Sequence, residues 1–305
     1  MKTKVIFLVL LVSMIVTAQV TEDGVLRGHI EPVNGVAFSP DGNWLISVSD
    51  DLSVRIWDVE SRTLEREIYP HNSFVRHVIF NLGGDLMVTT SWDGTAQIFS
   101  VLAGRFSREA RISNLGSPVD AVAFSLDQDV LALGVGDGTI RLFDAGTWEQ
   151  SDVIAVDDGL HIMALAFSPS MDEPILAAAV GFPSLSLNLW HLGESEPFIT
   201  LDFPATDAVF VDETTLIAVS DMGEFLRWDG EESDITTYED VWFTSLAVYD
   251  DRIAAGTLDG EIYVWEGDEL TILEGDDPVN DVAFSVDGEL LAAATDAGTV
   301  RLFKF

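Results

Sequence analysis

Few residues of this chain have the types and spacing that chemistry needs. There are five histidines, 52 acidic side chains and no cysteine. Without cysteine there are no disulfides, thiolate metal sites, iron–sulfur clusters or cysteine nucleophiles. The zinc motif H-E-x-x-H, the nucleophile elbow G-x-S-x-G and the glycine-rich phosphate loops do not occur either. The sequence therefore predicts no catalytic residue, no metal centre and no cofactor.

Calcium is the metal that the acidic residues could serve, because it takes six to eight oxygen ligands. Two segments are rich in acids, DGEESDITTYED at 229–240 and EGDDPVND at 274–281. Neither has the D-x-[DN]-x-[DN]-G spacing of a calcium loop. We interpret both as solvated acidic loops.

Charge is unevenly distributed along the chain. The formal net charge is −37. Residues 19–152 carry 20 acids and 9 bases, and residues 153–305 carry 32 acids and 4 bases. Such a surface argues against nucleic acid and against anionic membranes, both of which need lysine and arginine. It favours a cationic partner or, equally, adaptation to a salty exterior.

The first 18 residues, MKTKVIFLVLLVSMIVTA, have the layout of a secretory signal peptide. Lys2 and Lys4 precede an apolar run, and Val16 and Ala18 form a small-residue cleavage site before Gln19. The run is shorter than the roughly 20 residues of a membrane span, so an uncleaved anchor is the less favoured alternative. We expect an exported, extracytoplasmic protein whose mature chain, 19–305, leaves the membrane. The lack of cysteine and of N-x-S/T sites favours a bacterial source.

A motif recurs about every 40 residues through the rest of the chain. Residues 33–58 read VNGVAFSPDGNWLISVSDDLSVRIWD, and similar segments occur at 75–99, 119–144 and 279–303. Weaker copies occupy 167–190, 210–228 and 248–265. Each unit closes on an aromatic residue, and these are Trp57, Phe99, Phe143, Trp190, Trp228, Trp265 and Phe303. Seven units thus fill the mature chain as a single domain, without a linker.

Within a unit, hydrophobic residues alternate with a period of two, and pairs such as Asp41–Gly42 mark tight turns. No convincing helical pattern is present. Each unit is therefore expected to be a small antiparallel sheet of three or four strands. One such sheet cannot bury both of its faces, so the units must stack, and a closed ring protects their edges.

The sequence at this point resembles the WD40-repeat family. The resemblance covers residues 20–305 and is carried by Gly28–His29, Phe38-Ser39-Pro40-Asp41-Gly42, Asp51 and Trp57–Asp58. It implies an all-β, seven-bladed β-propeller of four-stranded antiparallel blades. It also implies a buried hydrogen-bonded set formed by His29, Ser47 (or Ser49), Asp51 and Trp57.

The family pattern weakens after the first unit. The aspartate six residues before the closing aromatic is kept as Asp51, Asp93, Asp137 and Asp259, and Ser184, Met222 and Ala297 replace it elsewhere. A histidine at the family position recurs only as His71. We therefore expect apolar packing to hold most blades together.

The two ends of the repeat array are expected to meet. The last unit ends after its third strand, and residues 20–27 resemble the fourth strand near 270–275. The N-terminal strand is thus expected to complete the last blade; the alternative is an open array. A closed ring has no edge that requires pairing, so a monomer is expected.

The resemblance places the loops before the first strand and between the second and third strands on one rim, the usual recognition face. Phe74, Arg76 and Trp92 fall there together in the second unit, and His161 and Trp242 lie on the same rim. Aromatic and arginine side chains are typical of binding hot spots, although rim aromatics can instead pack on neighbouring loops. We expect a non-catalytic platform that binds a protein or peptide. The alternatives are a propeller-type hydrolase or lyase with its site in the central channel, and a cation-binding or salt-adapted structural protein.

Overall fold

The computed structural model describes residues 20–127, 129–156, 161–170, 173–181 and 184–305. The expected signal peptide at 1–18 lies outside these residues. The described chain forms 28 β-strands and no helix. It therefore holds no helix that could cross a membrane.

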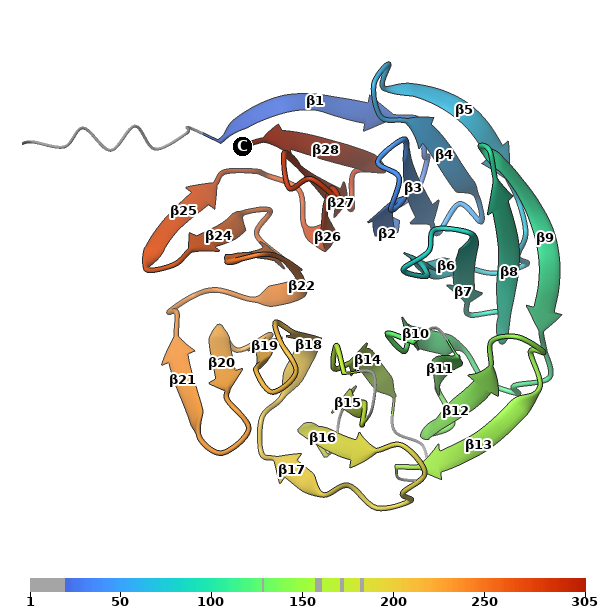
Figure 1. Cartoon of the computed structure of the whole chain (residues 1–305). Helices are drawn as coiled ribbons and strands as arrows, with labels where there is room; N and C mark the ends of the chain where they lie inside the picture. The colour runs from blue at the N-terminus through green and yellow to red at the C-terminus, as the bar shows by residue number, and fades with distance from the viewer. Residues whose placement is uncertain (1–19, 128, 157–160, 171–172, 182–183) are drawn as a thin grey trace, which may run out of the picture.

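The strands form seven four-stranded antiparallel sheets arranged as blades around a central channel, as Figure 1 shows. Blade 1 contains β2 (Val33–Phe38), β3 (Trp44–Ser49), β4 (Val54–Asp58) and β5 (Thr63–Ile68). Blade 2 contains β6 (Val75–Phe80), β7 (Leu86–Ser91), β8 (Thr95–Leu102) and β9 (Arg105–Ile112). Blade 3 contains β10 (Val119–Phe124), β11 (Val130–Val135), β12 (Thr139–Asp144) and β13 (Gln150–Ala155).

The remaining four blades follow the same order. Blade 4 contains β14 (Ile162–Phe167), β15 (Ile175–Val180), β16 (Ser186–His191) and β17 (Ile199–Leu201). Blade 5 contains β18 (Ala205–Phe210), β19 (Leu216–Ser220), β20 (Glu224–Trp228) and β21 (Ser233–Thr237). Blade 6 contains β22 (Phe243–Tyr249), β23 (Arg252–Thr257), β24 (Ile262–Glu266) and β25 (Glu269–Leu273). Blade 7 contains β26 (Val279–Phe284), β27 (Leu290–Thr295), β28 (Thr299–Lys304) and β1 (Thr21–Arg27).

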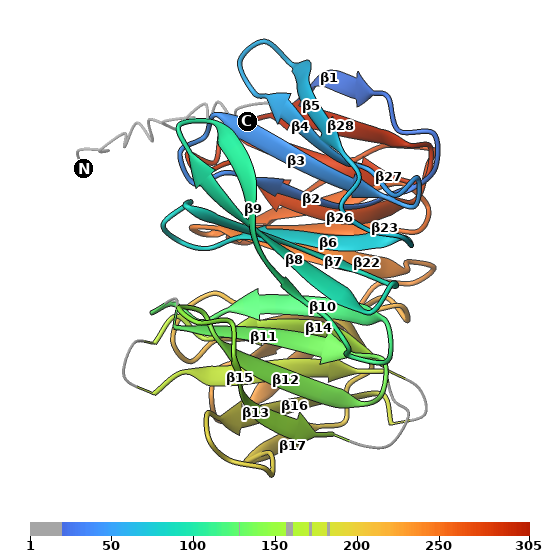
Figure 2. The ribbon, with the colours of Figure 1, turned by 90° about the vertical axis from the view of Figure 1, so that its right-hand side faces the viewer.

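In each blade the first strand lines the channel and the fourth lies on the perimeter; Figure 2 looks onto the outer strands β9 and β13. The expected all-β, seven-bladed propeller is confirmed.

The hydrophobic core lies between blades. Seven apolar clusters are present, and each draws its buried residues from two neighbouring blades. Between blades 7 and 1, for example, Trp57 and Val33 pack against Leu302 and Val300. Each Å² of apolar surface that is buried stabilises the fold by roughly 25 cal/mol. This stabilisation is therefore gained only when two blades pack together.

The N-terminal strand closes the ring. β1 pairs antiparallel with β28, from Thr21 opposite Lys304 to Arg27 opposite Thr299. Leu26 is only 5% exposed and belongs to the cluster shared by blades 7 and 1. The expectation that the N-terminal strand completes the last blade is confirmed.

Replacing Leu26 by alanine tests this closure. The change leaves a cavity in the cluster between blades 7 and 1, and we expect it to lower the free energy of unfolding by about 2–5 kcal/mol. The exposed Thr21→Ala, in the same strand, should change it by less than about 0.5 kcal/mol. Urea titration measures both. Equal midpoints for the two variants would mean that β1 does not close the ring in solution.

Candidate functional site

His29 in blade 1 forms the centre of a buried hydrogen-bonded set. Its Nδ1 lies 2.9 Å from Asp51 Oδ2, and its Nε2 lies 2.7 Å from Ser47 Oγ. Trp57 Nε1 donates to the same Ser47 Oγ at 2.9 Å. Ser53 Oγ, which the sequence analysis did not single out, also donates to Asp51, at 2.5 Å. Ser49 instead donates to a backbone carbonyl.

The ionised form of Asp51 is stabilised within this set. Burial alone would raise its pKa, but hydrogen bonds from His29 and Ser53 hold the pKa of Asp51 well below its usual range. Blade 2 repeats the arrangement in part, with His71 Nε2 lying 2.9 Å from Thr89 Oγ1 and Nδ1 3.3 Å from Asp93. These two histidines therefore hold their blades together.

The residues at the channel mouth are positioned by a β-bulge. In all seven blades the pairing of the first and second strands skips the second residue of the first strand. A bulge leaves that residue unpaired and redirects its side chain. The seven bulge residues all line the channel, and they are Asn34, Arg76, Asp120, Met163, Thr206, Thr244 and Asn280.

Four of these bulge residues bind the next blade. Asn34 Nδ2 donates to Val75 O at 2.9 Å, and Asn280 Nδ2 to Val33 O at 3.0 Å. Thr206 and Thr244 donate in the same way, to Phe243 O at 3.1 Å and Val279 O at 2.6 Å. Short polar side chains at this position thus join neighbouring inner strands.

Blades 2 and 3 use the same position differently. The guanidinium carbon of Arg76 lies 5.2 Å from the Trp92 ring centroid, within the range of a cation–π interaction. Trp92 Nε1 donates to Asp120 Oδ1 at 2.6 Å, and Asp120 Oδ2 lies 3.1 Å from His161 Nδ1. Phe74 packs on Trp92 with ring centroids 5.4 Å apart. We call these five residues the rim cluster.

The rim cluster is ordered by its own contacts and still open to solvent. Phe74 is 39% exposed and Trp92 is 43% exposed. Arg76 is anchored at its other side by donating to Asn34 Oδ1 at 3.0 Å. Binding would therefore require little further ordering of these side chains, which favours affinity.

The structure brings together four of the five predicted rim residues. Phe74, Arg76 and Trp92 touch directly, and His161 joins them through Asp120. Trp242 precedes β22 in blade 6, on the other side of the ring in Figure 1. It is exposed but separate from the rim cluster.

The channel below the rim cluster is acidic. It is a cavity of about 620 Å³, and its lining includes Arg76, His77 and His161. Six aspartates also line it, and these are Asp50, Asp120, Asp207, Asp221, Asp281 and Asp296. The field at the mouth therefore attracts cations.

Asp207 and Asp281 occupy the third position of their inner strands, and each bridges to the next blade. Asp207 Oδ2 accepts from Leu246 N at 2.7 Å, and Asp281 Oδ2 accepts from Val36 N at 2.9 Å. Burial in the channel wall raises the pKa of Asp207 to about 6 and that of Asp281 to about 8. Burial and then the Arg76 charge lower the pKa of His77, at the same position of blade 2, to about 4. The sequence analysis missed both aspartates. An acidic residue inside an otherwise apolar inner strand, as in VNDVAF (β26) and ATDAVF (β18), could have indicated them.

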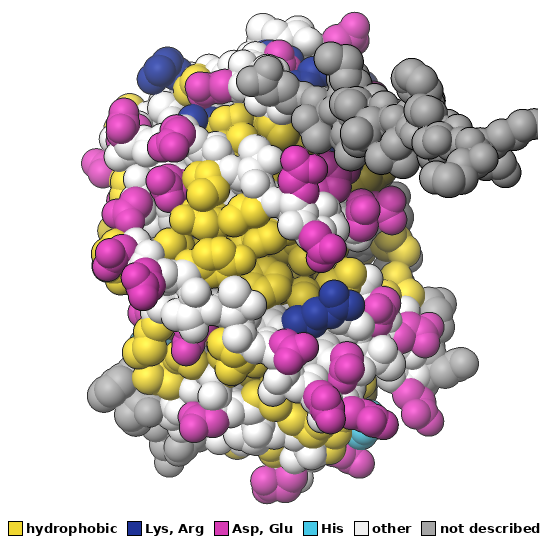
Figure 3. Space-filling view, turned by 90° about the vertical axis from the view of Figure 1, so that its left-hand side faces the viewer, with side chains coloured by type: hydrophobic (Ala, Val, Ile, Leu, Met, Phe, Trp, Pro, Cys, Tyr) yellow, Lys and Arg dark blue, Asp and Glu magenta, His cyan; other side chains and the backbone are white. Residues whose placement is uncertain are grey.

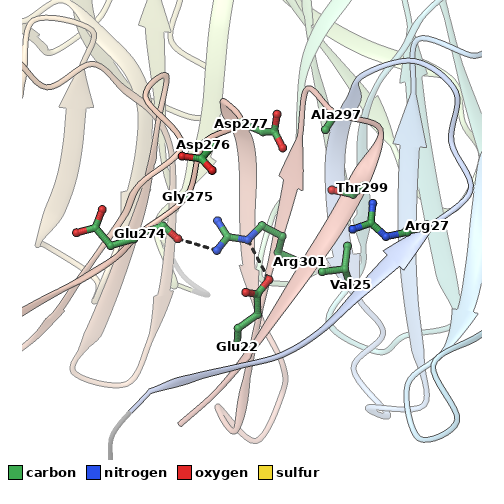
Figure 4. Close-up of a pocket in the computed structure, with 10 residues that line it drawn as sticks. All are labelled: Glu22, Val25, Arg27, Glu274, Gly275, Asp276, Asp277, Ala297, Thr299 and Arg301. Carbon is green, nitrogen blue, oxygen red and sulfur yellow. Dashed lines mark hydrogen bonds and ion pairs between the residues drawn. The ribbon is translucent and has the colours of Figure 1, made fainter.

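A second cavity, of about 360 Å³, lies where the ring closes (Figure 4). Arg301 points into it from β28, with Nε 3.2 Å from Glu22 Oε1 and Nη2 donating to Glu274 O at 2.7 Å. The arginine thus connects β1, β28 and the crossover from blade 6. We assign this cavity to ring closure.

Among the residues that the structure describes, no three histidine or carboxylate side chains are arranged to hold a metal ion. In the first acidic segment, Asp229 instead accepts the backbone N–H groups of Glu231 and Glu232. That carboxylate orders its own turn.

Four segments of the chain match the family model of the WD domain, G-beta repeat (WD40), at residues 21–58, 62–100, 111–144 and 267–304. These segments are similar to WD40 repeats. Blade 4, blade 5 and most of blade 6 lie between the matches, where the sequence shows weaker copies.

Several characterised proteins are similar to parts of the chain. COMPASS component SWD3 of Saccharomyces cerevisiae is 33% identical over 123 residues, which are 40% of this chain and 38% of that protein. A guanine nucleotide-binding protein subunit beta-like protein of Encephalitozoon cuniculi is 31% identical over 127 residues, which are 40% of this chain and 37% of that protein. Telomerase protein component 1 of Mus musculus is 24% identical over 261 residues, which cover 79% of this chain and 10% of that protein. The chain thus spans less than two fifths of the length of each.

The role of Ser47 predicts the effect of its removal. Ser47→Ala leaves His29 Nε2 and Trp57 Nε1 buried without a partner, so we expect the free energy of unfolding to fall by about 1–3 kcal/mol or more. Ser107→Ala, on the exposed strand β9, should change it by less than about 0.5 kcal/mol. Chemical denaturation of both variants decides the matter, and an unchanged Ser47→Ala midpoint would exclude Ser47 as the shared partner.

Asp281 predicts a pH dependence of stability. Its pKa rises from 3.8 to about 8 on folding, so the folded protein holds more protons than the unfolded chain between these values. Stability therefore falls as pH rises through that window. The lowered pKa of His77 has the opposite effect on stability, but only below the ordinary histidine pKa of 6.5. The raised pKa of Asp207 lowers stability with rising pH only up to about pH 6. We expect the melting temperature to fall between about pH 6.5 and 8.

Differential scanning fluorimetry of two variants across this pH range shows which carboxyl group causes the fall in melting temperature. Asp281→Asn should remove it, because the amide does not titrate. Asp296→Asn replaces an exposed acid that lines the same channel and should keep it. A slope that persists in Asp281→Asn would show that another group causes it and would contradict the prediction.

Proposed function

We infer that this seven-bladed propeller, built with WD40 repeats, is a non-catalytic interaction platform that binds a protein or peptide segment across the rim cluster. One observation carries the proposal. At the bulge position, four blades use a short side chain that donates to the next blade's inner strand, whereas Arg76 and Asp120 bridge neighbouring blades and also order exposed aromatic and imidazole side chains. The exposed side chains of Trp92 and His161 are therefore held in place at the channel mouth.

The composition and geometry of the rim cluster support this function. Tryptophan, tyrosine and arginine contribute most of the energy at protein interfaces, and few residues carry it. Fixed side chains lose less entropy on binding. Two of the similar proteins are named as a component of COMPASS and as a subunit beta-like protein, which agrees with a role in assembly. The particular partners of those proteins are not assigned to this chain.

Charge defines the chemistry of the proposed partner. Six aspartates line the channel below the cluster, against the single arginine Arg76. Asp281, whose pKa is raised to about 8, is mostly protonated at neutral pH, so the other five carry the negative charge. A partner segment with a lysine or arginine over the channel would be attracted, and an acidic segment would be repelled. Because exposed charges are screened by salt, such binding should weaken with ionic strength.

We propose in addition that the protein is exported and meets its partner outside the cytoplasm. The layout of residues 1–18 supports this. Cell fractionation followed by N-terminal sequencing is the direct check. A mature protein that begins at Gln19 is expected, and a cytoplasmic chain that begins at Met1 would contradict export.

The triple variant Phe74→Ala, Arg76→Ala, Trp92→Ala tests the platform. Residues 19–305 serve as bait in an extracytoplasmic extract, and mass spectrometry identifies what binds. Calorimetry with the purified partner then measures affinity. We expect the triple variant to weaken binding by about 100-fold or more, since the hot spots of an interface cluster together.

The control replaces exposed residues of blades 1 and 2 by alanine: Leu64 of β5, Leu102 at the end of β8 and Arg108 of β9. This variant should bind like the unmodified protein. A folded rim variant that keeps the partner would contradict the proposal. A partner that binds equally well at low and high salt would contradict the proposed role of the acidic channel.

A further inference from the structure

Each blade places two residues at the channel mouth, the one before its first strand and the one after its second strand. We call these two residues the mouth pair of the blade. In six blades the second residue of the pair donates its backbone N–H to the carbonyl of the first, for example Trp92 to Phe74 at 3.1 Å and Leu258 to Trp242 at 2.9 Å. The mouth pairs therefore occupy equivalent positions around the ring and can be compared directly.

Only blades 2 and 6 have a mouth pair made of two large apolar residues. Blade 2 has Phe74 and Trp92, blade 6 has Trp242 and Leu258, and the exposed fractions of the four side chains lie between 39% and 48%. The other five pairs join a proline or histidine to an aspartate or glycine, and they are Pro32–Asp50, Pro118–Gly136, His161–Gly181, Pro204–Asp221 and Pro278–Asp296. Five blades are thus built without large apolar residues here, so the fold does not require them in blades 2 and 6.

The two apolar mouth pairs lie on opposite sides of the channel. Figure 1 shows β6 of blade 2 and β22 of blade 6 facing each other across it. Trp92 and Leu258 both line the channel cavity of about 620 Å³. Trp92 Nε1 is bonded to Asp120, whereas the Trp242 indole makes no hydrogen bond within the part of the chain that the structure describes. An indole with an apolar body and an unused N–H suits an interface.

Carboxylates lie between the two apolar mouth pairs. On the shorter arc from blade 6 to blade 2, blade 7 presents Asp296 and blade 1 presents Asp50, and both line the channel. Asn280 Nδ2 donates to Asp296 Oδ1 at 2.8 Å, and Asn34 Nδ2 donates to Asp50 Oδ1 at 2.7 Å. A carboxylate has about four acceptor positions. Each amide therefore orients its aspartate and leaves positions open to a cationic donor.

The negative charge is concentrated on the blade 6 side. Residues 205–273, which form blades 5 and 6, hold eighteen acids and two bases, whereas residues 75–112 of blade 2 hold three acids and four bases. Figure 3 looks onto the outer side of blades 5 to 7 and shows carboxylates around an apolar band, with few basic side chains. A ligand that reaches blade 6 therefore enters a strongly negative field.

We propose that the partner segment is extended, spans the channel mouth from blade 2 to blade 6, and carries an apolar side chain at each end with lysine or arginine between them. Its first apolar side chain packs on the rim cluster and its second on Trp242 and Leu258. Its basic side chains lie against Asp50 and Asp296. The inference rests on the proposed function, because the blade 2 end is the rim cluster. Two linked anchors raise affinity only when the segment fits the span, and the charge between them selects a basic partner.

Synthetic peptides test this segment with the protein of residues 19–305. The probe has a tryptophan at each end and two lysines in the middle, joined by glycine–serine spacers of three lengths. One control replaces both lysines by glutamate, and a second replaces one tryptophan by serine. At the best spacer length, we expect fluorescence anisotropy to show the probe binding at least about tenfold more tightly than either control. A probe that binds no more tightly than its controls at any length would overturn the proposal.

The variant Trp242→Ala, Leu258→Ala assigns the second anchor. It should weaken the probe by about tenfold or more and change the one-tryptophan control by no more than about twofold, because only the probe uses both anchors. The matched variant Leu82→Ala, Val286→Ala removes exposed apolar side chains from the turns after β6 and β26 and should leave the probe unaffected. Probe binding that survives the blade 6 change would reject the second anchor.

The rim triple variant separates this inference from the proposed function. Loss of the probe in that variant, together with full binding by Trp242→Ala, Leu258→Ala, would leave the proposed function in place and reject the spanning segment. Full binding by the folded triple variant would reject both, because the blade 2 anchor is common to them.

A charge variant keeps the test decisive if the blade 6 variant is destabilised. Asp50→Asn, Asp296→Asn keeps an acceptor oxygen for the neighbouring amides and removes the two charges. At low salt it should weaken the lysine probe by about tenfold and strengthen the glutamate peptide. Glu194→Gln, Glu196→Gln, in the exposed loop between β16 and β17, should alter neither affinity. Unchanged affinities in the aspartate variant would overturn the proposal, as would a second copy of the chain that occupies the mouth and excludes both peptides.

Discussion

The burial of each blade's faces against its neighbours is the constraint on which the structure depends. Among the described residues the seven apolar clusters all lie between blades, and none of them belongs to a single blade. The ring is therefore stable only when the last interface forms, and Leu26 on β1 completes it. Closure by backbone pairing between the first and last strands also removes an apolar edge that could otherwise pair with another chain.

Ring closure in turn fixes the channel mouth. Each inner strand has a bulge that turns one side chain toward the channel, and four of these side chains join the next blade. Arg76 donates to Asn34 of blade 1, and Asp120 bridges Trp92 of blade 2 and His161 before blade 4, so these two bulge residues also join blades and in doing so order exposed side chains. The proposed recognition surface thus depends on which side chain each blade places at the bulge.

The sequence predicts the features that depend on short separations and on the repeat. The seven closing aromatics indicate the blades, and Phe74, Arg76 and Trp92 belong to one hairpin. Contacts between blades are less accessible, because Asp120 and His161 are 41 residues apart and meet only in the closed ring. The sequence analysis grouped Trp242 with the rim residues of the second unit because they share one rim, although Trp242 begins the sixth unit on the other side of the ring.

The most direct test of the account is amide hydrogen exchange of the protein with and without its captured partner. Binding across the rim should slow exchange at the start of β6 and in the turn after β7, which hold Phe74, Arg76 and Trp92. Exchange along the outer strands β5 and β13 should not change. Protection of the outer strands alone, with an unaffected rim, would contradict the central claim that the channel mouth of blades 2 to 4 is the recognition surface.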